Sequence, residues 1–310
     1  MEGAAGGWMI IALLIIFSLS RGLSSVAAKD VLGKTIPKSQ RGKVTGWSAS
    51  AAGLITLAYG IVLVFTPTDN FTPAVYGLML VSAALFWIAG AFVYAKIKEF
   101  PGETSGGANG FLEAIKRVNI LKTDKPFRKF VFTRSLLLCS ALTAPYYVVL
   151  AQDKLGSPAY LLGLFVIADG AAGLISGPIW GKFADVSSRN VMIIAAALTA
   201  ILGISVFMID SLQSEWLSLM WVLPLVYFFL SIAHQGVRVG RKTYVVDLAE
   251  GNKRTDYVSV SNTLIGVILL LMGLTGTLAT FLSISQIILV LSMLGVIGAW
   301  MAKTLPDVEK

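Results

Sequence analysis

Long apolar segments and short polar segments alternate along the whole chain. Each apolar segment holds roughly 20 residues, and because an α-helix rises about 1.5 Å per residue, each is long enough to cross the roughly 30 Å hydrocarbon core of a bilayer. Charged or turn-forming residues separate the segments. The pattern therefore predicts nine transmembrane helices, at 8–28, 44–65, 74–95, 130–151, 158–180, 190–209, 216–238, 257–281 and 284–302.

The composition favours an all-α polytopic membrane protein and argues against several other classes. The chain is 56% hydrophobic and only 14% charged, whereas a soluble chain has about 25% charged residues. The single cysteine, Cys139, excludes an internal disulfide and a cysteine-based metal site, and the single histidine does not form a zinc site by itself. The chain contains no H-E-x-x-H, G-x-S-x-G or P-loop motif. We therefore expect neither an enzyme nor a metal or cofactor site.

Basic residues concentrate in every second connection between the predicted helices. One set of connections carries 21 Lys or Arg residues, and the other set carries only Lys154. Because positive residues stay on the cytoplasmic side during insertion, the sequence predicts a cytoplasmic C-terminus and an N-terminus outside. This distribution explains the net charge of +8 without a nucleic-acid partner. We expect an integral protein of the plasma membrane, such as the inner membrane of a bacterium, surrounded by membrane lipid.

Two distant parts of the chain share the same residues in the same order. Both copies run from a span through an inner connection into the next span, which indicates a parallel repeat. The repeat predicts three helices in 1–96, a linker in 97–129 with a basic amphipathic helix on the anionic inner leaflet, and a six-helix half in 130–310. Halves of equal size would require three more helices before Met1. The first copy comprises Arg21, Asp30, Arg41, Gly53 and Gly60, and the second comprises Arg238, Asp247, Arg254, Gly266 and Gly273.

Glycines in the repeat recur at helical spacing. Gly46, Gly53 and Gly60 lie seven residues apart, as do Gly266 and Gly273. This spacing places small residues on one helix face, so we expect close backbone packing at both places.

The polar stretch GKFADVSSRN, residues 181–190, separates two of the predicted helices. Its spacing, Gly181-x-x-x-Asp185-x-x-x-Arg189, resembles the inner-loop signature of the major facilitator superfamily. The resemblance implies a twelve-helix fold, of which this chain would supply helices 4–12, and secondary transport of a small solute by alternating access. The alternative is a truncated membrane protein or scaffold that does not transport. Three positions depart from the signature, namely Val186, Ser188 and Asn190.

The polar stretch 181–190, which we call the hinge, suggests contacts that would hold the cytoplasmic end of the protein closed. Gly181 would let the chain turn tightly, Asp185 would accept hydrogen bonds from amides at a neighbouring helix N-terminus, and Arg189 would reach a carboxylate or helix C-terminal carbonyls. The simpler interpretation is that the basic residues only set the topology and Asp185 only caps the next helix. Through the resemblance, the candidate gate also includes the repeat residues Asp30, Arg41, Asp247 and Arg254.

Charged residues inside the predicted spans are candidates for coupling or for substrate binding. Asp169 lies near the centre of its span, where a carboxylate costs at least about 2.5–3.5 kcal/mol. It either serves a coupling proton, a coupling cation or the small-molecule substrate, or it forms a structural pair with Arg21, Arg134 or Arg238. Arg21 and Arg238 either face the central path or reach back to the membrane surface. The remaining candidates are His234, which titrates or is simply hydrogen-bonded, and the pocket residues Tyr146, Tyr147 and Asn262.

Overall fold

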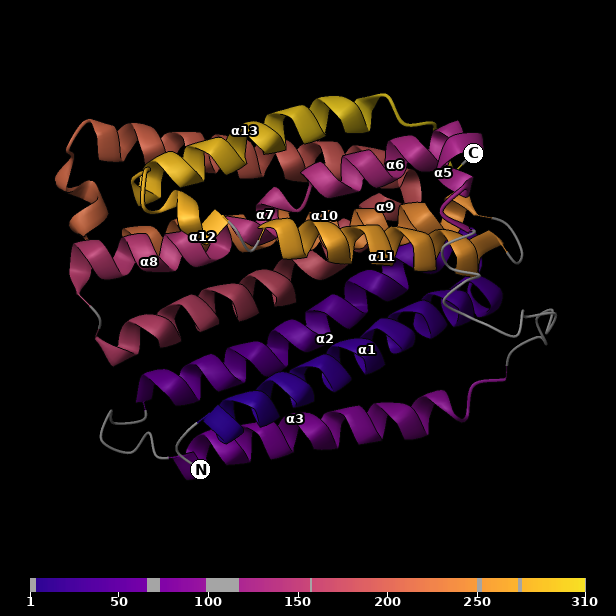
Figure 1. Cartoon of the computed structure of the whole chain (residues 1–310), viewed down its shortest axis with the longest axis horizontal. Helices are drawn as coiled ribbons and strands as arrows, with labels where there is room; N and C mark the ends of the chain where they lie inside the picture. The colour runs from indigo at the N-terminus through magenta and orange to yellow at the C-terminus, as the bar shows by residue number, and fades with distance from the viewer. Residues whose placement is uncertain are drawn as a thin grey trace.

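The computed structural model describes residues 4–65, 73–98, 117–156, 158–249, 253–272 and 275–309. Every element in these parts of the chain is a helix (Figure 1). The N-terminal group of helices comprises α1 (Ala4–Thr35), α2 (Lys38–Phe65) and α3 (Pro73–Tyr94). The C-terminal group comprises α6 (Lys125–Leu136), α7 (Cys139–Leu142), α8 (Ala144–Leu155), α9 (Ala159–Ser211), the 3-10 helix η2 (Glu215–Ser218), α10 (Val222–Leu248), α11 (Lys253–Met272), α12 (Thr275–Leu278) and α13 (Ile284–Lys303).

Eight helical segments in the described residues are long and apolar enough to cross a membrane, and the longest of them contains two of the nine predicted spans. Helix α9 is interrupted at Ser187, whose φ of −162° and ψ of 97° are extended. A Cβ atom on Gly236 of α10 would lie 2.8 Å from Trp180 and 2.9 Å from Ala195. Two residues so far apart in one straight helix could not both reach Gly236. Helix α9 is therefore a hairpin of two helices, which agrees with the predicted spans 158–180 and 190–209.

The turn of this hairpin corrects the role predicted for Gly181. The chain does not turn at Gly181, because the helix continues to Val186 and bends only at Ser187. A Cβ atom on Gly181 would instead lie 2.6 Å from the carbonyl oxygen of Gly42 in α2. Gly181 is thus needed for the close approach of two helices rather than for a turn.

Several predicted boundaries also shift. The span predicted at 216–238 begins at Val222 and continues to Leu248, so Arg241 and Lys242 lie in α10 rather than in a loop. Charged residues suggested a loop, but no proline follows Pro224 within α10, and packing keeps the segment helical. The span predicted at 130–151 begins at Lys125, because the Asp124 side chain accepts a hydrogen bond from the amide of Phe127 and caps α6.

The linker is described only in part. Most of the predicted amphipathic helix lies outside the described residues, and its described end forms α5 (Ile120–Thr123) next to α6. The two chain ends lie at opposite ends of the bundle, as an odd number of spans requires (Figure 1). The connection from α1 to α2, helix α5 and the C-terminus share one end, which we call the Arg41 end.

Helix α2 packs directly on the first half of α9 through glycines. A Cβ atom on Gly46 would overlap the carbonyl oxygen of Gly177, and one on Gly53 would lie 2.7 Å from the carbonyl oxygen of Gly170. The close packing predicted for Gly46, Gly53 and Gly60 is confirmed. The prediction of close packing is wrong for Gly266, because a Cβ atom at this position would have no neighbour within 4 Å. Gly273 lies outside the described residues.

Candidate gate and central cavity

Asp185 joins the two groups of helices at the Arg41 end. Its Oδ1 accepts a hydrogen bond from the amide of Gly42 at 2.6 Å, and its Oδ2 accepts one from the amide of Lys43 at 2.8 Å. Both amides lie in the second turn of α2. The Asp185 side chain therefore accepts from amides near the start of a neighbouring helix, as the sequence predicted, and that helix belongs to the other group.

A buried ion pair joins the same two groups beside Asp185. Arg41 Nη1 lies 2.5 Å from Asp247 Oδ1, and the two side chains are 7% and 0% exposed. The Arg41 guanidinium also donates to the carbonyl oxygens of Gly33 at 2.7 Å and Ile36 at 2.9 Å, at the C-terminal end of α1. One side chain of α2 thus holds the end of α1 and the end of α10 together.

Arg254 occupies the corresponding place in the second copy of the repeat, but its contacts differ. Its guanidinium covers Gly33 so closely that any Cβ there would overlap it, and its Nε donates weakly to the carbonyl oxygen of Val246 at 3.5 Å. Asp30 attracts Arg254 electrostatically, whereas the Asp30 carboxylate forms its ion pair with Lys34 at 2.5 Å. The repeat therefore brings Asp and Arg of opposite copies together at both places, with a direct ion pair at only one.

Within the residues that the structure describes, the contacts of Arg189 lie in the C-terminal group. It donates to the carbonyl oxygen of Leu305 at 3.0 Å and lies 3.7 Å from a carboxylate oxygen of Asp307. Beside it, the amide of Ser188 donates to Glu309 at 2.7 Å, while burial raises the pKa of the Glu309 carboxyl. These contacts fasten the C-terminal segment to the hairpin of α9. The predicted kinds of partner, a carboxylate and a carbonyl oxygen just after a helix end, are both present, and the role of Arg189 in a gate stays a prediction.

The intramembrane residues converge from α1, α9 and α10. Asp169 forms no ion pair within the described residues, and it attracts Arg238 electrostatically. Arg21 of α1 is close enough to Arg238 to repel it. His234 lies one turn before Arg238, and its Nδ1 is 3.1 Å from the hydroxyl of Ser140. The arrangement joins Arg21, Asp169 and Arg238 in one electrostatic group, and the coupling role of Asp169 stays a prediction.

The tyrosines predicted for the pocket lie elsewhere. Tyr147 is completely buried in the apolar core around Leu150, Phe165 and Leu223, and Tyr146 packs against that core. Tyr146 and Tyr147 are adjacent residues of a short helix, so the sequence did not indicate which of the two side chains points into the protein. Asn262 instead holds a buried arginine, because its Oδ1 accepts from Arg134 Nη2 at 2.9 Å.

A small polar cavity lies between α2 and α10. Its volume is about 70 Å³, and Arg238 is the one predicted residue among those that line it. Gln235 is 5% exposed, and its Oε1 has no hydrogen-bond partner in the described part of the protein. A polar amide within a membrane span was the signal that could have singled it out. The remaining lining residues are Thr45, Ser48, Ala49, Ala52, Val239 and Lys242.

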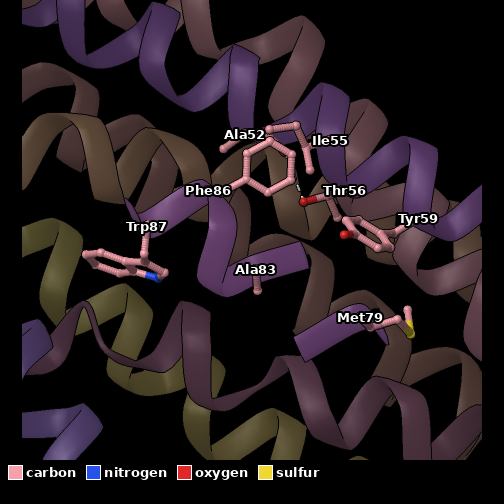
Figure 2. A pocket seen from close by; sticks show the side chains of 8 residues that line it. All are labelled: Ala52, Ile55, Thr56, Tyr59, Met79, Ala83, Phe86 and Trp87. Carbon is pink, nitrogen blue, oxygen red and sulfur yellow. Dashed lines mark hydrogen bonds between the residues drawn. The ribbon is translucent and has the colours of Figure 1, made fainter. Parts of the chain in front are cut away.

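A larger hollow of about 450 Å³ lies between α2 and α3 (Figure 2). Apolar and aromatic side chains dominate its lining, including Phe86 and Trp87, and no charged residue is among them. These two rings are about half exposed. The hollow belongs to the outer apolar surface of α2 and α3, where lipid is the expected neighbour, and we leave it out of the site.

The protein is thus a polytopic helical membrane protein whose two groups of helices pack along α2 and the first half of α9, with a buried ion pair between them at the Arg41 end. The sequence model of the Major Facilitator Superfamily matches residues 3–268. The chain therefore belongs to the Major Facilitator Superfamily, which confirms the resemblance of the hinge motif. Proteins of this family are membrane transporters rather than enzymes. No curated protein matches the chain closely enough to show a relationship.

Proposed function

We propose that the protein is a secondary transporter that moves a small solute by alternating access. The observation that carries this proposal is the set of contacts at the Arg41 end, where Asp185 holds the start of α2 and Arg41 pairs with Asp247. In this proposal 1–96 and 130–310 act as two halves, joined by the linker 97–129, and these contacts form a gate between them.

The chemistry of the contacts suits a gate that opens and closes. The Asp185 contacts and the ion pair consist of a few charge-assisted hydrogen bonds, which are strong when aligned and are lost when the halves rotate apart. The glycines of α2 and α9 leave smooth backbone surfaces along which the halves can move. Family membership and these contacts together support transport.

We further propose that the Arg41 end faces the cytoplasm. The basic connections gather at this end, and positive residues stay inside during insertion. We expect a reporter fused after Lys310 or inserted near Gly106 to read as cytoplasmic, and one inserted near Asn70 to read as periplasmic. Alkaline phosphatase and fluorescent-protein fusions provide the measurement. A periplasmic signal from the Gly106 insertion would overturn the orientation.

The gate can be tested without knowing the substrate. A cysteine introduced at Ala49, which lines the cavity, reports access from either side when Cys139 is replaced by alanine. We expect Asp185→Asn to raise the rate of thiol modification from the Arg41 end about tenfold, because hydrogen bonds to a charged group contribute about 1.5–3 kcal/mol. A membrane-impermeant maleimide applied to inside-out vesicles gives that rate.

A matched control separates gating from a general effect of charge. Asp307→Asn removes a carboxylate at the same end that contacts Arg189 within a single half, so it should leave the modification rate unchanged. Equal rates for Asp185→Asn and the parent would contradict the gate. Access from one side only in every variant would favour the alternative, a membrane scaffold that does not transport.

A further inference from the structure

Six basic side chains from three helices lie within electrostatic range of one another; five of them are buried or part-buried, and Arg21 is exposed. Lys29 is close enough to be repelled by Arg134, Arg241 and Lys242. Arg238, Arg241 and Arg21 repel one another in the same way. We call this set the basic cluster, comprising Arg21 and Lys29 of α1, Arg134 of α6, and Arg238, Arg241 and Lys242 of α10.

The hydrogen-bond partners of Arg134 and Lys29 are neutral. Arg134 is 8% exposed and donates to the Ser261 hydroxyl at 2.6 Å and to Asn262 at 2.9 Å, while its Nε has no partner in the described residues. Lys29 is 9% exposed and donates to the Ser25 hydroxyl at 3.1 Å. Neutral oxygens satisfy donors but leave the positive charge uncompensated.

Five of the described carboxylates form ion pairs with basic residues outside the cluster. No ion pair joins the six side chains to a carboxylate within the ranges that the structure describes. Among the described residues, Asp169 is the one carboxylate that attracts a member of the cluster, namely Arg238. Carboxylates that pair with other basic residues are Asp30, Asp210, Asp247, Asp256 and Asp307.

Such a cluster is unfavourable unless an anion compensates it. Removing a charge from water without a counter-charge costs several kcal/mol per ion, and like charges in a low-dielectric interior repel strongly. Basic residues that serve only to orient the chain in the membrane would extend into water. Arg241 and Lys242 instead lie within α10, surrounded by protein and only partly accessible.

A cavity adjoins the cluster and offers room for a ligand group. Arg238, Lys242 and Gln235 line the same hollow of about 70 Å³, and since one water needs about 10–15 Å³ of such volume, it can hold a small oxyanion. The Gln235 amide is more than nine-tenths buried and has an unused oxygen. This buried amide is a second, independent sign that a polar ligand belongs here.

We propose that the basic cluster and the Gln235 cavity bind an anionic group, a phosphate or a carboxylate, of the transported solute. This inference rests on the proposed transport function and specifies its substrate class. Arginine and lysine side chains from both halves would surround the anion, so the ligand itself would hold the halves in register. The same chemistry could come from an anionic lipid headgroup, which the experiment distinguishes.

The test measures thermal unfolding of the full chain in a neutral detergent at constant ionic strength. Inorganic phosphate and citrate are titrated against chloride, choline chloride serves as a cationic control, and phosphatidylglycerol is compared with phosphatidylcholine in mixed micelles. We expect phosphate or citrate to raise the unfolding temperature in a saturable manner. Arg238→Gln and Arg241→Gln should each weaken that binding about tenfold or more, since each removes a charge-assisted contact.

The variants remain informative because they should fold. Each removes one of several part-buried positive charges that repel one another, so the unfolding temperature without ligand should equal or exceed that of the parent. Asp169→Asn removes the single opposing charge and should tighten binding. A shift no larger for phosphate and citrate than for chloride would overturn the proposal, and a shift with phosphatidylglycerol alone would overturn its assignment to a solute.

The result of the anion-binding experiment is independent of the result of the gate experiment. Anion binding without a change in the access of a cysteine at position 49 would contradict transport by this gate but not the anion site. Gating without anion binding would contradict the anion site and leave the transport proposal standing.

Discussion

Replacing Asp247 by alanine should lower the free energy of unfolding by about 3–5 kcal/mol, the usual cost of removing one partner of a buried ion pair. The variant leaves the Arg41 guanidinium, 7% exposed in the parent protein, without a counter-charge. The carbonyl oxygens of Gly33 and Ile36 still accept its hydrogen bonds but do not neutralise it. Reversible denaturant unfolding in detergent micelles, followed by tryptophan fluorescence, gives the difference.

A double-mutant cycle isolates the pair. Arg41→Met removes the charge but keeps much of the side-chain volume, so Arg41→Met combined with Asp247→Ala should recover part of the loss. Asp307→Ala serves as a matched control, because its ion pair with Arg189 is longer and part-exposed, and exposed pairs contribute only about 0–1 kcal/mol. Additive losses for Arg41→Met and Asp247→Ala would show that the two residues are not coupled.

Replacing Gly46 by alanine should separate α2 from α9 and destabilise the protein by about 1–3 kcal/mol, as overpacking does. The new methyl group would overlap the carbonyl oxygen of Gly177 and lie 2.8 Å from the Cα atom of Gly181. Backbone atoms cannot move aside as a flexible side chain can, so the two helices must shift. Thermal unfolding and the yield of monodisperse protein measure the effect.

The matched control is Gly90→Ala in α3. A Cβ atom there would have no neighbour within 4 Å, and alanine is the better helix former by about 1 kcal/mol. The two substitutions are chemically identical, and their expected effects have opposite signs. Equal effects at the two positions would show that the contact of α2 with α9 is looser than the structure indicates.

The sequence predicted which kinds of contact the site residues make, but not which residues are their partners. An aspartate beside a helix end favours free backbone amides wherever they are, so Asp185 was correctly expected to accept hydrogen bonds from a helix N-terminus. The sequence did not show that these amides belong to Gly42 and Lys43, 143 and 142 residues away. Likewise, the repeat placed Arg41 and Asp247 in different copies, and the sequence did not show that these two residues form a buried ion pair.

For two other residues the sequence did not identify the surroundings. Arg189 was expected to reach a carboxylate or helix C-terminal carbonyls, and the chain after α13 returns to the hairpin and supplies Asp307 and Leu305 as these partners. The role of Arg189 in a gate stays a prediction. Tyr147 was expected in the pocket, but breaks in the helix at Leu137 and Thr143 rotate the segment, and Tyr147 points into the core. Neither the path of the C-terminal segment nor the rotation of α8 has a local sequence signal.

The sequence by itself determined the helical spans, their alternating direction and the family. These properties depend on the length of apolar segments and on the distribution of charge along the chain, which are one-dimensional quantities. Only the tertiary structure decided which faces of the helices meet. The packing of α1, α6 and α10 gathers into one cluster the basic residues that are dispersed between Arg21 and Lys242, because helix periodicity sets the face of a side chain but not the partner of that face.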